Sequence, residues 1–294
     1  MDMSDYILSC ESTADIPYDY CESRGIPIIF YGYEIDGKIY EDNMERNPKQ
    51  TEEFYAAIAA RKLPSTSQIN QFAYEEFFDE LLEKGDVIHL VMGTGFSASY
   101  QNAMNAAEEV KEKHPDRKLY VVNSLCGCSG LGLFLDDAAD RRDEGMSIDE
   151  LFRWCEDHKL NYHHEFFNSD LMYFMRTGRL SGPTAVIGNM LNIVPSMHLN
   201  AESKLIAYGK ERGRKKAIRH MLNEMIDHAE NGTAYTGKCF VSGADCSEDA
   251  AYLAGLVKET FPSCSIRICN IGTIIASHCG PGTLSMYYYG DPRT

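Results

Sequence analysis

The chain has 294 residues, of which 44% are hydrophobic, and this is enough to build one large or two ordinary folded domains. Its 28 basic and 44 acidic residues give a formal net charge of -16 at pH 7. This charge excludes general attraction to nucleic acid or to an anionic membrane surface, so any anionic ligand has to be bound by local groups. We therefore expect no nucleic-acid partner.

The ten cysteines are expected to be free thiols. The N-terminal segment MDMSDYILSCES lacks the basic stretch and apolar core of a secretory signal, which favours the cytoplasm. Cys126 and Cys128 have C-x-C spacing with no second pair at a zinc-ligand interval, so no metal site is expected. The uncharged stretches 180–201 and 268–290 contain Pro, Gly, Asn and His, which argues against membrane-spanning helices.

In the first half, short apolar runs alternate with segments of helical periodicity. The predicted strands are residues 6–10, 26–33, 86–91 and 118–123. Helices are predicted in the segment that ends at Arg24, at residues 51–61 and 73–84, in the segment after Ser99, and at residues 129–142 and 148–161. Residues 35–50 and 64–68 are expected to be loops. This alternation predicts a mainly parallel sheet covered on both faces, with ligands at the carboxyl ends of its strands.

The second half begins after a predicted domain boundary near residues 162–168. Its predicted helices are residues 169–177, 184–191, 215–229 and 248–260. Its predicted strands are residues 193–199, 205–209, 238–243, 265–270 and 284–289. A short turn at residues 200–204 joins two of these strands directly, so this half is expected to contain a mixed sheet.

The segment DVIHLVMGTGFSASYQ, residues 86–101, is the most informative local pattern. A buried strand ends at Gly93 and Gly95, and Thr94, Ser97 and Ser99 then precede a helix. Glycines let backbone amides approach a ligand, and a helix N-terminus favours negative charge, so this turn predicts an anion site.

Two enzymatic interpretations of the same turn stay open. The Gly93-Gly95 turn formally satisfies a dinucleotide-binding fingerprint, which would make the protein a nucleotide-dependent enzyme. Ser97 lies in a sequence close to the G-x-S-x-G elbow, which would make it the nucleophile of a serine hydrolase. Neither interpretation accounts for the other hydroxyl-rich loop, at residues 64–68.

Two further clusters are candidates for binding. His278 stands between an apolar run, interpreted as a strand, and a Gly-Pro-Gly turn, where its imidazole could donate a hydrogen bond to an anion or be satisfied by the backbone. The segment 210–216 concentrates cations near the start of a predicted helix, where they oppose the helix dipole. Its basic residues indicate either a solvated surface or a docking surface for an acidic or phosphorylated partner. These residues are Lys210, Arg212, Arg214, Lys215 and Lys216.

Taken together, the motifs resemble the bacterial DegV family of fatty-acid-binding proteins. In chain order they are ILSCESTADIP, STSQ, GTGFSASYQNA, SGLGL, RTGRLSG, GNMLNIVPSMHL, GKERGRKKAI and IGTIIASHCGPG. The resemblance implies an α/β fold of two domains. The first, residues 1–165, would be a three-layer α/β/α domain with a mainly parallel sheet that carries the carboxylate-binding loops. The second, residues 166–294, would be a two-layer α/β domain with a mixed sheet that forms the acyl-chain tunnel.

The resemblance also implies which residues bind the ligand. By match to the family motifs, the carboxylate of a long-chain fatty acid would be held at the polar end by Thr66, Thr94, Ser97, Arg179 and His278. Four positions depart from the family pattern: Glu11 replaces an aspartate, Gly93-Thr94 replaces two serines, and Cys279 replaces a threonine. The change at Gly93 removes one possible hydrogen-bond donor.

The function implied by the resemblance is that of a carrier and not of an enzyme. Such a protein presents its bound fatty acid to a separate kinase subunit, which phosphorylates the carboxylate to an acyl phosphate. No phosphate-binding loop of the G-x-x-x-x-G-K-[ST] type is present in the sequence, and we expect no cofactor. The basic residues between Lys210 and Lys216 are then the expected surface for kinase docking or for transient approach to a membrane.

Overall fold

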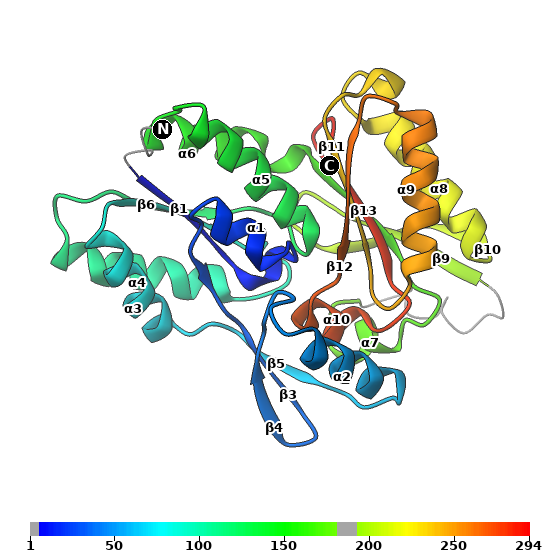
Figure 1. Ribbon diagram of the computed structural model, residues 1–294, viewed down its shortest axis with the longest axis horizontal. Coiled ribbons are helices and arrows are strands. Elements are labelled where there is room, and N and C mark those ends of the chain that lie inside the picture. The colour runs from blue at the N-terminus through cyan, green and yellow to red at the C-terminus, as the bar shows by residue number, and fades with distance from the viewer. Residues whose placement is uncertain (1–5, 181–192) are drawn as a thin grey trace.

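Sheet A forms the centre of the first half of the molecule in a computed structural model that describes residues 6–180 and 193–294 (Figure 1). Its four parallel strands are, in spatial order, β2 (Ile28–Ile29), β1 (Tyr6–Glu11), β6 (Asp86–Val91) and β7 (Leu119–Asn123). β1 and β6 are buried almost throughout, as is typical of central strands in a parallel sheet. The carboxyl ends of these strands meet at one edge of the sheet.

Helices cover both faces of sheet A. α3 (Gln71–Leu82) and α4 (Ser99–Lys113) pack against each other and against β6. α5 (Ser129–Asp143) and α6 (Ile148–His158) pack together on the opposite face, where α5 contacts β1 and α6 contacts β6 and β7 (Figure 1). α1 (Tyr18–Ser23) follows β1 through a short helical turn. This half therefore has three layers.

Sheet C forms the second half and is mixed. Neighbouring strands are antiparallel except β11 and β12, which are parallel. In spatial order the strands are β10 (Leu205–Arg212), β9 (Ile193–Leu199), β8 (Tyr162–Phe167), β13 (Leu284–Tyr289), β11 (Lys238–Gly243) and β12 (Ser265–Asn270). α8 (Arg214–His228) and α9 (Ser247–Thr260) pack against these strands, and α5 contacts β8, β11 and β13. α5 therefore joins the two sheets.

A third, smaller group of elements connects distant parts of the chain. Its members are β3 (Gly32–Ile35), β4 (Lys38–Glu41), β5 (Ser65–Ser67), α2 (Pro48–Ala59), α7 (Met172–Arg176) and α10 (Thr273–Cys279). β3 pairs antiparallel with both β4 and β5 in sheet B. α10 contacts α2, α7, β3 and β5, so the last helix of the chain packs against segments from its first quarter.

The arrangement confirms the predicted fold class, an α/β protein with one parallel and one mixed sheet. The proposed division into residues 1–165 and 166–294 stays a prediction, and that boundary runs within β8, which belongs to sheet C. In residues 6–180 and 193–294, every helix is too short or too polar to cross a lipid bilayer.

Four local predictions were wrong. Residues 64–68 were expected to be a loop, but β5 is held as a strand by its pairing with β3, a contact that local sequence does not encode. Residues 35–50 were also expected to be a loop, but residues 38–41 form β4, which pairs antiparallel with β3. The apolar run before His278 is helix α10, where tertiary packing overrides the strand preference of its β-branched residues.

The fourth wrong prediction is the residue at which α2 begins. Its cap is Asn47, whose side chain accepts a hydrogen bond from the Gln50 amide at 3.3 Å, and Pro48 occupies the first turn. The helix therefore begins before Thr51, where the sequence analysis started it. The predicted helix at residues 184–191 lies outside the described residues.

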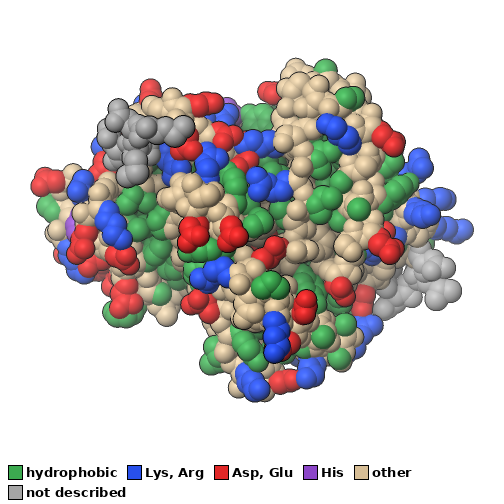
Figure 2. Space-filling model, viewed as in Figure 1, with side chains coloured by type: hydrophobic (Ala, Val, Ile, Leu, Met, Phe, Trp, Pro, Cys, Tyr) green, Lys and Arg blue, Asp and Glu red, His purple; other side chains and the backbone are tan. Residues whose placement is uncertain are grey.

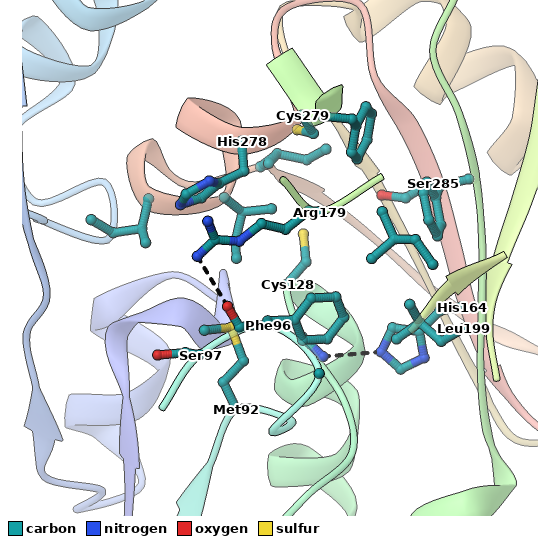
Figure 3. Close-up of a pocket in the computed structure, with 18 of the residues that line it drawn as sticks. Met92, Phe96, Ser97, Cys128, His164, Arg179, Leu199, His278, Cys279 and Ser285 are labelled. Atoms are coloured by element: carbon teal, nitrogen blue, oxygen red, sulfur yellow. Dashed lines mark hydrogen bonds between the residues drawn. The ribbon is translucent and has the colours of Figure 1, made fainter. Parts of the chain in front are cut away.

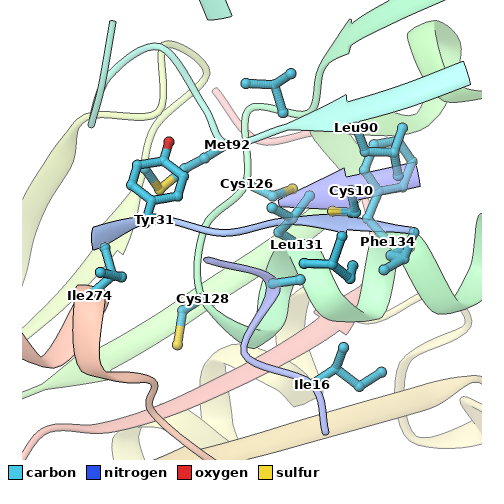
Figure 4. Packing of buried hydrophobic residues seen from close by; sticks show 14 of the residues in the cluster. Cys10, Ile16, Tyr31, Leu90, Met92, Cys126, Cys128, Leu131, Phe134 and Ile274 are labelled. Carbon is cyan, nitrogen blue, oxygen red and sulfur yellow. The ribbon is translucent and has the colours of Figure 1, made fainter. Parts of the chain in front are cut away.

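The hydrophobic core of the first half continues into the cavity described below. Figure 4 shows Cys10, Leu90, Leu131 and Phe134 packed between sheet A and α5. The same cluster of buried residues reaches Met92, Tyr31, Cys128 and Ile274 at the carboxyl edge of the sheet. These four residues also line the cavity. The packing of the core therefore positions part of the cavity wall.

Stability should depend on pH through His89, which is fully buried in β6. Its Nδ1 lies 2.9 Å from the Ser9 hydroxyl, and burial lowers its pKa to about 3. In the unfolded chain histidine titrates near pH 6.5, so the unfolded state binds more protons below that pH and acid favours unfolding. From pH 7 to pH 5, wild-type protein should lose about 2 kcal/mol of unfolding free energy relative to His89→Leu.

Urea unfolding of both proteins at the two pH values measures this difference. His89→Leu also leaves the Ser9 hydroxyl without its partner, but that cost does not vary with pH and cancels in the comparison. An equal stability difference at pH 7 and pH 5 would contradict the assignment of a neutral, buried His89.

Candidate functional site: a cavity between the two sheets

A cavity of about 510 Å³ lies between the carboxyl-edge loops of sheet A and the inner face of sheet C (Figure 3). Loops after β6 and β7 form one side, β8, β9, β10 and β13 form the other, and α10 closes it. Its size is within the range of small-molecule sites. Much of the lining is apolar, and these residues are Met92, Phe96, Phe166, Phe174, Leu199, Leu205, Ile271, Ile274 and Ile275.

All five residues predicted to hold a carboxylate line this cavity. They come from four separate segments of the chain: Thr66 from β5, Thr94 and Ser97 from the loop before α4, Arg179 from the segment after α7, and His278 from α10. Thr94 is exposed, and the other four are partly buried. The polar end of the cavity therefore reaches the protein surface.

His278 is held in place by Thr66. The Thr66 hydroxyl lies 2.8 Å from Nε2 of the imidazole, while Nδ1 is buried and has no hydrogen-bond partner among the described residues. Burial, and next the charge of Arg179, lower the pKa of His278 to about 4. The imidazole is therefore neutral at pH 7 and has one N–H to donate.

Arg179 links the second half of the chain to the loop before α4. Its guanidinium donates to the Phe96 carbonyl at 3.1 Å and to the Thr177 carbonyl at 2.6 Å, and Figure 3 shows the first of these bonds. Burial lowers the pKa of Arg179 from its usual value, but the group remains a cation in proteins. It supplies a positive charge at the polar end of the cavity.

Thr94 and Ser97 make local contacts. The Thr94 hydroxyl accepts from the Asn123 side-chain amide at 3.2 Å, and the Ser97 hydroxyl accepts from the Ser99 backbone amide at 3.1 Å. Nε2 of His278 is bonded to Thr66, and among the described residues no histidine is hydrogen-bonded to Ser97, so no base is in place to activate this hydroxyl. The geometry does not support the hydrolase interpretation.

Protein atoms occupy the space beside the two glycines of this turn, where a Cβ would project. A Cβ on Gly93 would lie 2.7 Å from the Ser203 hydroxyl, and a Cβ on Gly95 would lie 2.3 Å from the Ser203 carbonyl oxygen. Ser203 belongs to the turn between β9 and β10, which occupies the space beside the glycines that a pyrophosphate would need. This contact argues against the nucleotide-dependent interpretation.

Glu11 is a buried residue that the sequence analysis did not assign to the site. Its carboxylate accepts from the Met92 amide at 2.8 Å, from the Tyr31 hydroxyl at 3.3 Å and from the Tyr74 hydroxyl. Burial raises its pKa. Glu11 thus ties the end of β1 to the end of β6 and directs Tyr31 toward the cavity, which Tyr31 lines.

Asn168 is another supporting residue that local sequence did not reveal. Its side-chain amide donates to the Cys279 carbonyl at 2.9 Å, to the Pro281 carbonyl at 3.1 Å and to the Thr283 hydroxyl at 2.8 Å. These bonds hold the Gly-Pro-Gly turn that follows α10. In the sequence Asn168 stands only at the end of the predicted domain boundary, residues 162–168, and no local motif indicates this role.

The basic segment lies beside this turn. Lys210 and Arg212 are in β10, Lys215 and Lys216 are in the first turn of α8, and all four are exposed. Figure 2 shows Lys and Arg side chains gathered at the edge of the molecule near these elements. A cationic surface is therefore available to an anionic partner.

Arg214 differs from its neighbours in this segment. Its guanidinium pairs with Asp249 at 2.5 Å and donates to the Gly282 carbonyl at 2.8 Å. It lies over the ring of Phe167, 4.9 Å from the ring centre. These contacts are internal, so a change of Arg214 would disturb the turn after α10 as well as the surface charge.

Comparison with known proteins supports the relationship that the motifs indicate. The family model described as "Uncharacterised protein, DegV family" matches residues 8–291. A DegV domain-containing protein of Clostridium perfringens is 33% identical over 294 residues, which is 99% of either chain.

Solved structures agree in fold. A DegV family protein of Thermus thermophilus, described as binding fatty acid, superposes with a TM-score of 0.85 at 25% identity and covers 97% of this chain and 99% of its own. The Fatty Acid Kinase (Fak) B3 protein of Streptococcus pneumoniae, solved with linoleic acid, has a TM-score of 0.83 at 18% identity, with 97% and 99% of the two chains covered. The match over residues 8–291 and the 33% identity show that this chain belongs to the DegV family.

Proposed function

We propose that this protein binds a long-chain fatty acid in the cavity between its two sheets and presents the carboxylate to a separate kinase subunit. The observation that carries the proposal is the composition of one cavity, which combines five predicted polar residues with an extended apolar lining. Structural relatives described as fatty-acid-binding proteins support it.

The carboxylate would be held by Thr94, Ser97, Arg179 and His278. Arg179 offers charge, and His278 offers its unpartnered Nδ1 as a neutral donor while Nε2 accepts from Thr66. Thr66 then orients the imidazole and does not itself donate to the ligand. Hydrogen bonds to a charged group contribute about 1.5–3 kcal/mol each, so these contacts fix the orientation of the acid.

The acyl chain would supply most of the affinity. Burial of about fifteen methylenes at about 0.8 kcal/mol each gives a gross driving force of about 12 kcal/mol. The cavity volume and its apolar lining suit such a chain. Thr94, Gly95 and Ala98 are exposed, so a carboxylate at this end would be accessible to a second protein while the chain stays buried.

The carrier would act beside a fatty acid kinase in the cytoplasm. The Streptococcus pneumoniae relative bears the name of such a kinase, which supports a kinase partner here. The kinase partner of the present protein would phosphorylate the exposed carboxylate of the bound fatty acid to an acyl phosphate. The described cysteines are free thiols, which suits a reducing compartment. Approach of the basic segment to a membrane stays a prediction.

Extraction of the purified protein with organic solvent, followed by mass spectrometry, tests the binding proposal. A fatty acid released in a stoichiometric amount is the expected result. Delipidated protein should then rebind a fluorescent fatty acid. Recovery of a nucleotide and no lipid, with no rebinding, would overturn the proposal.

Charge reversal tests the docking surface. Arg212→Glu combined with Lys215→Glu should slow acyl-phosphate formation with a supplied kinase by about tenfold, because exposed charges mainly control association rate. Fatty-acid retention should not change, since both side chains are exposed and Arg214, with its internal contacts, is left intact. Acyl-phosphate formation at low kinase concentration measures the effect.

The matched control reverses Lys111 and Lys113, two exposed cations in the last turn of α4. It changes the net charge by the same amount at another surface. Equal slowing in both double variants would show that net charge is responsible and that residues 210–216 are not a docking surface.

A further inference from the structure

One wall of the cavity carries polar groups well away from the proposed carboxylate end. Ser285 and Tyr287 from β13 and His164 from β8 line it. Figure 3 shows Ser285 and His164 on the side opposite His278 and Ser97, with the Ser285 oxygen turned toward the interior. These side chains place polar atoms on a wall that would otherwise contact the acyl chain with apolar groups alone.

Among the described residues of this wall, the hydrogen bonds leave acceptors free but no hydroxyl or imidazole donor. The Tyr287 hydroxyl donates to the Ser285 oxygen at 2.8 Å, and the Ser285 hydroxyl donates to the Ser242 carbonyl at 3.1 Å. Both protons are therefore used, while each oxygen keeps at least one lone pair. Burial, and next the adjacent Cys128, raise the pKa of Tyr287, so the phenol stays protonated.

His164 adds no spare donor. Its Nδ1 lies 2.9 Å from the Tyr162 carbonyl, and its Nε2 lies 3.2 Å from the Gly127 amide, which fixes the hydrogen on Nδ1. Burial lowers the pKa of His164 well below its usual value, so the ring remains neutral. A group that meets this wall must bring its own hydrogen.

The backbone at Cys128 supports a functional reason for the wall. Cys128 has φ 53° and ψ −153°, a region that is essentially restricted to glycine. Its side chain nevertheless lines the cavity beside Tyr287. Strained residues of this kind cluster at ligand-binding sites.

We propose that the preferred ligand is a hydroxy fatty acid, whose mid-chain hydroxyl donates a hydrogen bond to the oxygen of Tyr287 or Ser285. This inference rests on the proposed fatty-acid-binding function and specifies its ligand class. A keto group at the same position is only an acceptor, and Tyr287, Ser285 and His164 have no free donor to offer it. An unsubstituted chain leaves the two oxygens without a new partner.

Competition binding to delipidated protein tests the inference. The probes are stearic acid, hydroxystearic acids with the hydroxyl at different mid-chain carbons, and the matching ketostearic acids. The best hydroxystearic acid should bind about tenfold more tightly than its ketone and more tightly than stearic acid. Ser285→Ala combined with Tyr287→Phe should abolish this preference and leave stearic acid affinity the same or higher.

Tyr288→Phe is the matched control. Tyr288 is the neighbouring buried tyrosine of β13, and its side chain points to the opposite face of the sheet. It should keep the preference for the hydroxyl. Binding of stearic acid by every variant confirms that the cavity is intact.

The outcomes are distinguishable. Stearic acid binding with no preference for any hydroxystearic acid would overturn this inference and leave the proposed function standing. A preference that survives in the Ser285→Ala/Tyr287→Phe variant would overturn it as well. Failure of all three classes of acid to bind would overturn both proposals.

Discussion

Thr94→Val combined with His278→Ala is expected to weaken fatty-acid binding by about a hundredfold. Each substitution removes one donor to the proposed carboxylate, and two hydrogen bonds to a charged group contribute about 3 kcal/mol together. Thr94 is exposed and His278 is only partly buried, so the folded structure should persist. Titration of delipidated protein with a fluorescent fatty acid measures the loss.

The control combines Thr233→Val with His114→Ala, which changes the same residue types outside the cavity. Thr233 is exposed, and His114 lies at the end of α4, where it contacts Asp79. The control should bind like wild type. Wild-type affinity in the Thr94/His278 variant would exclude these two residues from the carboxylate site.

The pH profile of binding separates a neutral from a charged His278. With its pKa lowered to about 4, the imidazole of the free protein is neutral from pH 6 to pH 8. Affinity for the carboxylate should therefore be almost constant across that range. A steep loss of affinity as the pH rises through 6.5 would indicate that a protonated imidazole binds the ligand.

The main secondary structure could be predicted because its signals are local. The apolar runs at β1, β6 and β11 and the helical periodicity of α3 and α9 are properties of short stretches, and each was recognised. β5 could not be recognised, since residues 65–67 are polar and become a strand only by pairing with β3. The same reason applies to α10, which is a helix because it packs against α2 and α7.

The predicted site residues were found from sequence motifs. The residues that hold them in position were found only from the tertiary structure. Thr66 and His278 are 212 positions apart, and no local pattern indicates that their side chains meet. Ser203 is a further example. It fills the space beside Gly93, where the family pattern led us to expect only a missing hydroxyl. Residues from distant segments shape this end of the cavity, and sequence spacing does not encode such contacts.

Gly95→Ala is expected to lower fatty-acid affinity by at least tenfold and the free energy of unfolding by about 2 kcal/mol. The added Cβ would lie 2.3 Å from the Ser203 carbonyl oxygen and 2.8 Å from that of Glu202. Both are backbone atoms that cannot rotate away, so the turn between β9 and β10 must move, and overpacking of this kind costs about 1–3 kcal/mol. That movement displaces Leu199 and Leu205, which flank the turn and line the cavity.

Gly255→Ala provides the matched control because its effect should have the opposite sign. Gly255 lies inside α9, and a Cβ there would contact no atom within 4 Å, so the helical preference of alanine should stabilise the protein by about 0.5–1 kcal/mol. Urea unfolding and fatty-acid titration of both variants measure the two effects. Gly95→Ala with wild-type stability and affinity would show that the loop before α4 can separate from the turn at Ser203 at no cost. The contact between Gly95 and the turn at Ser203 would then have no role in shaping the cavity.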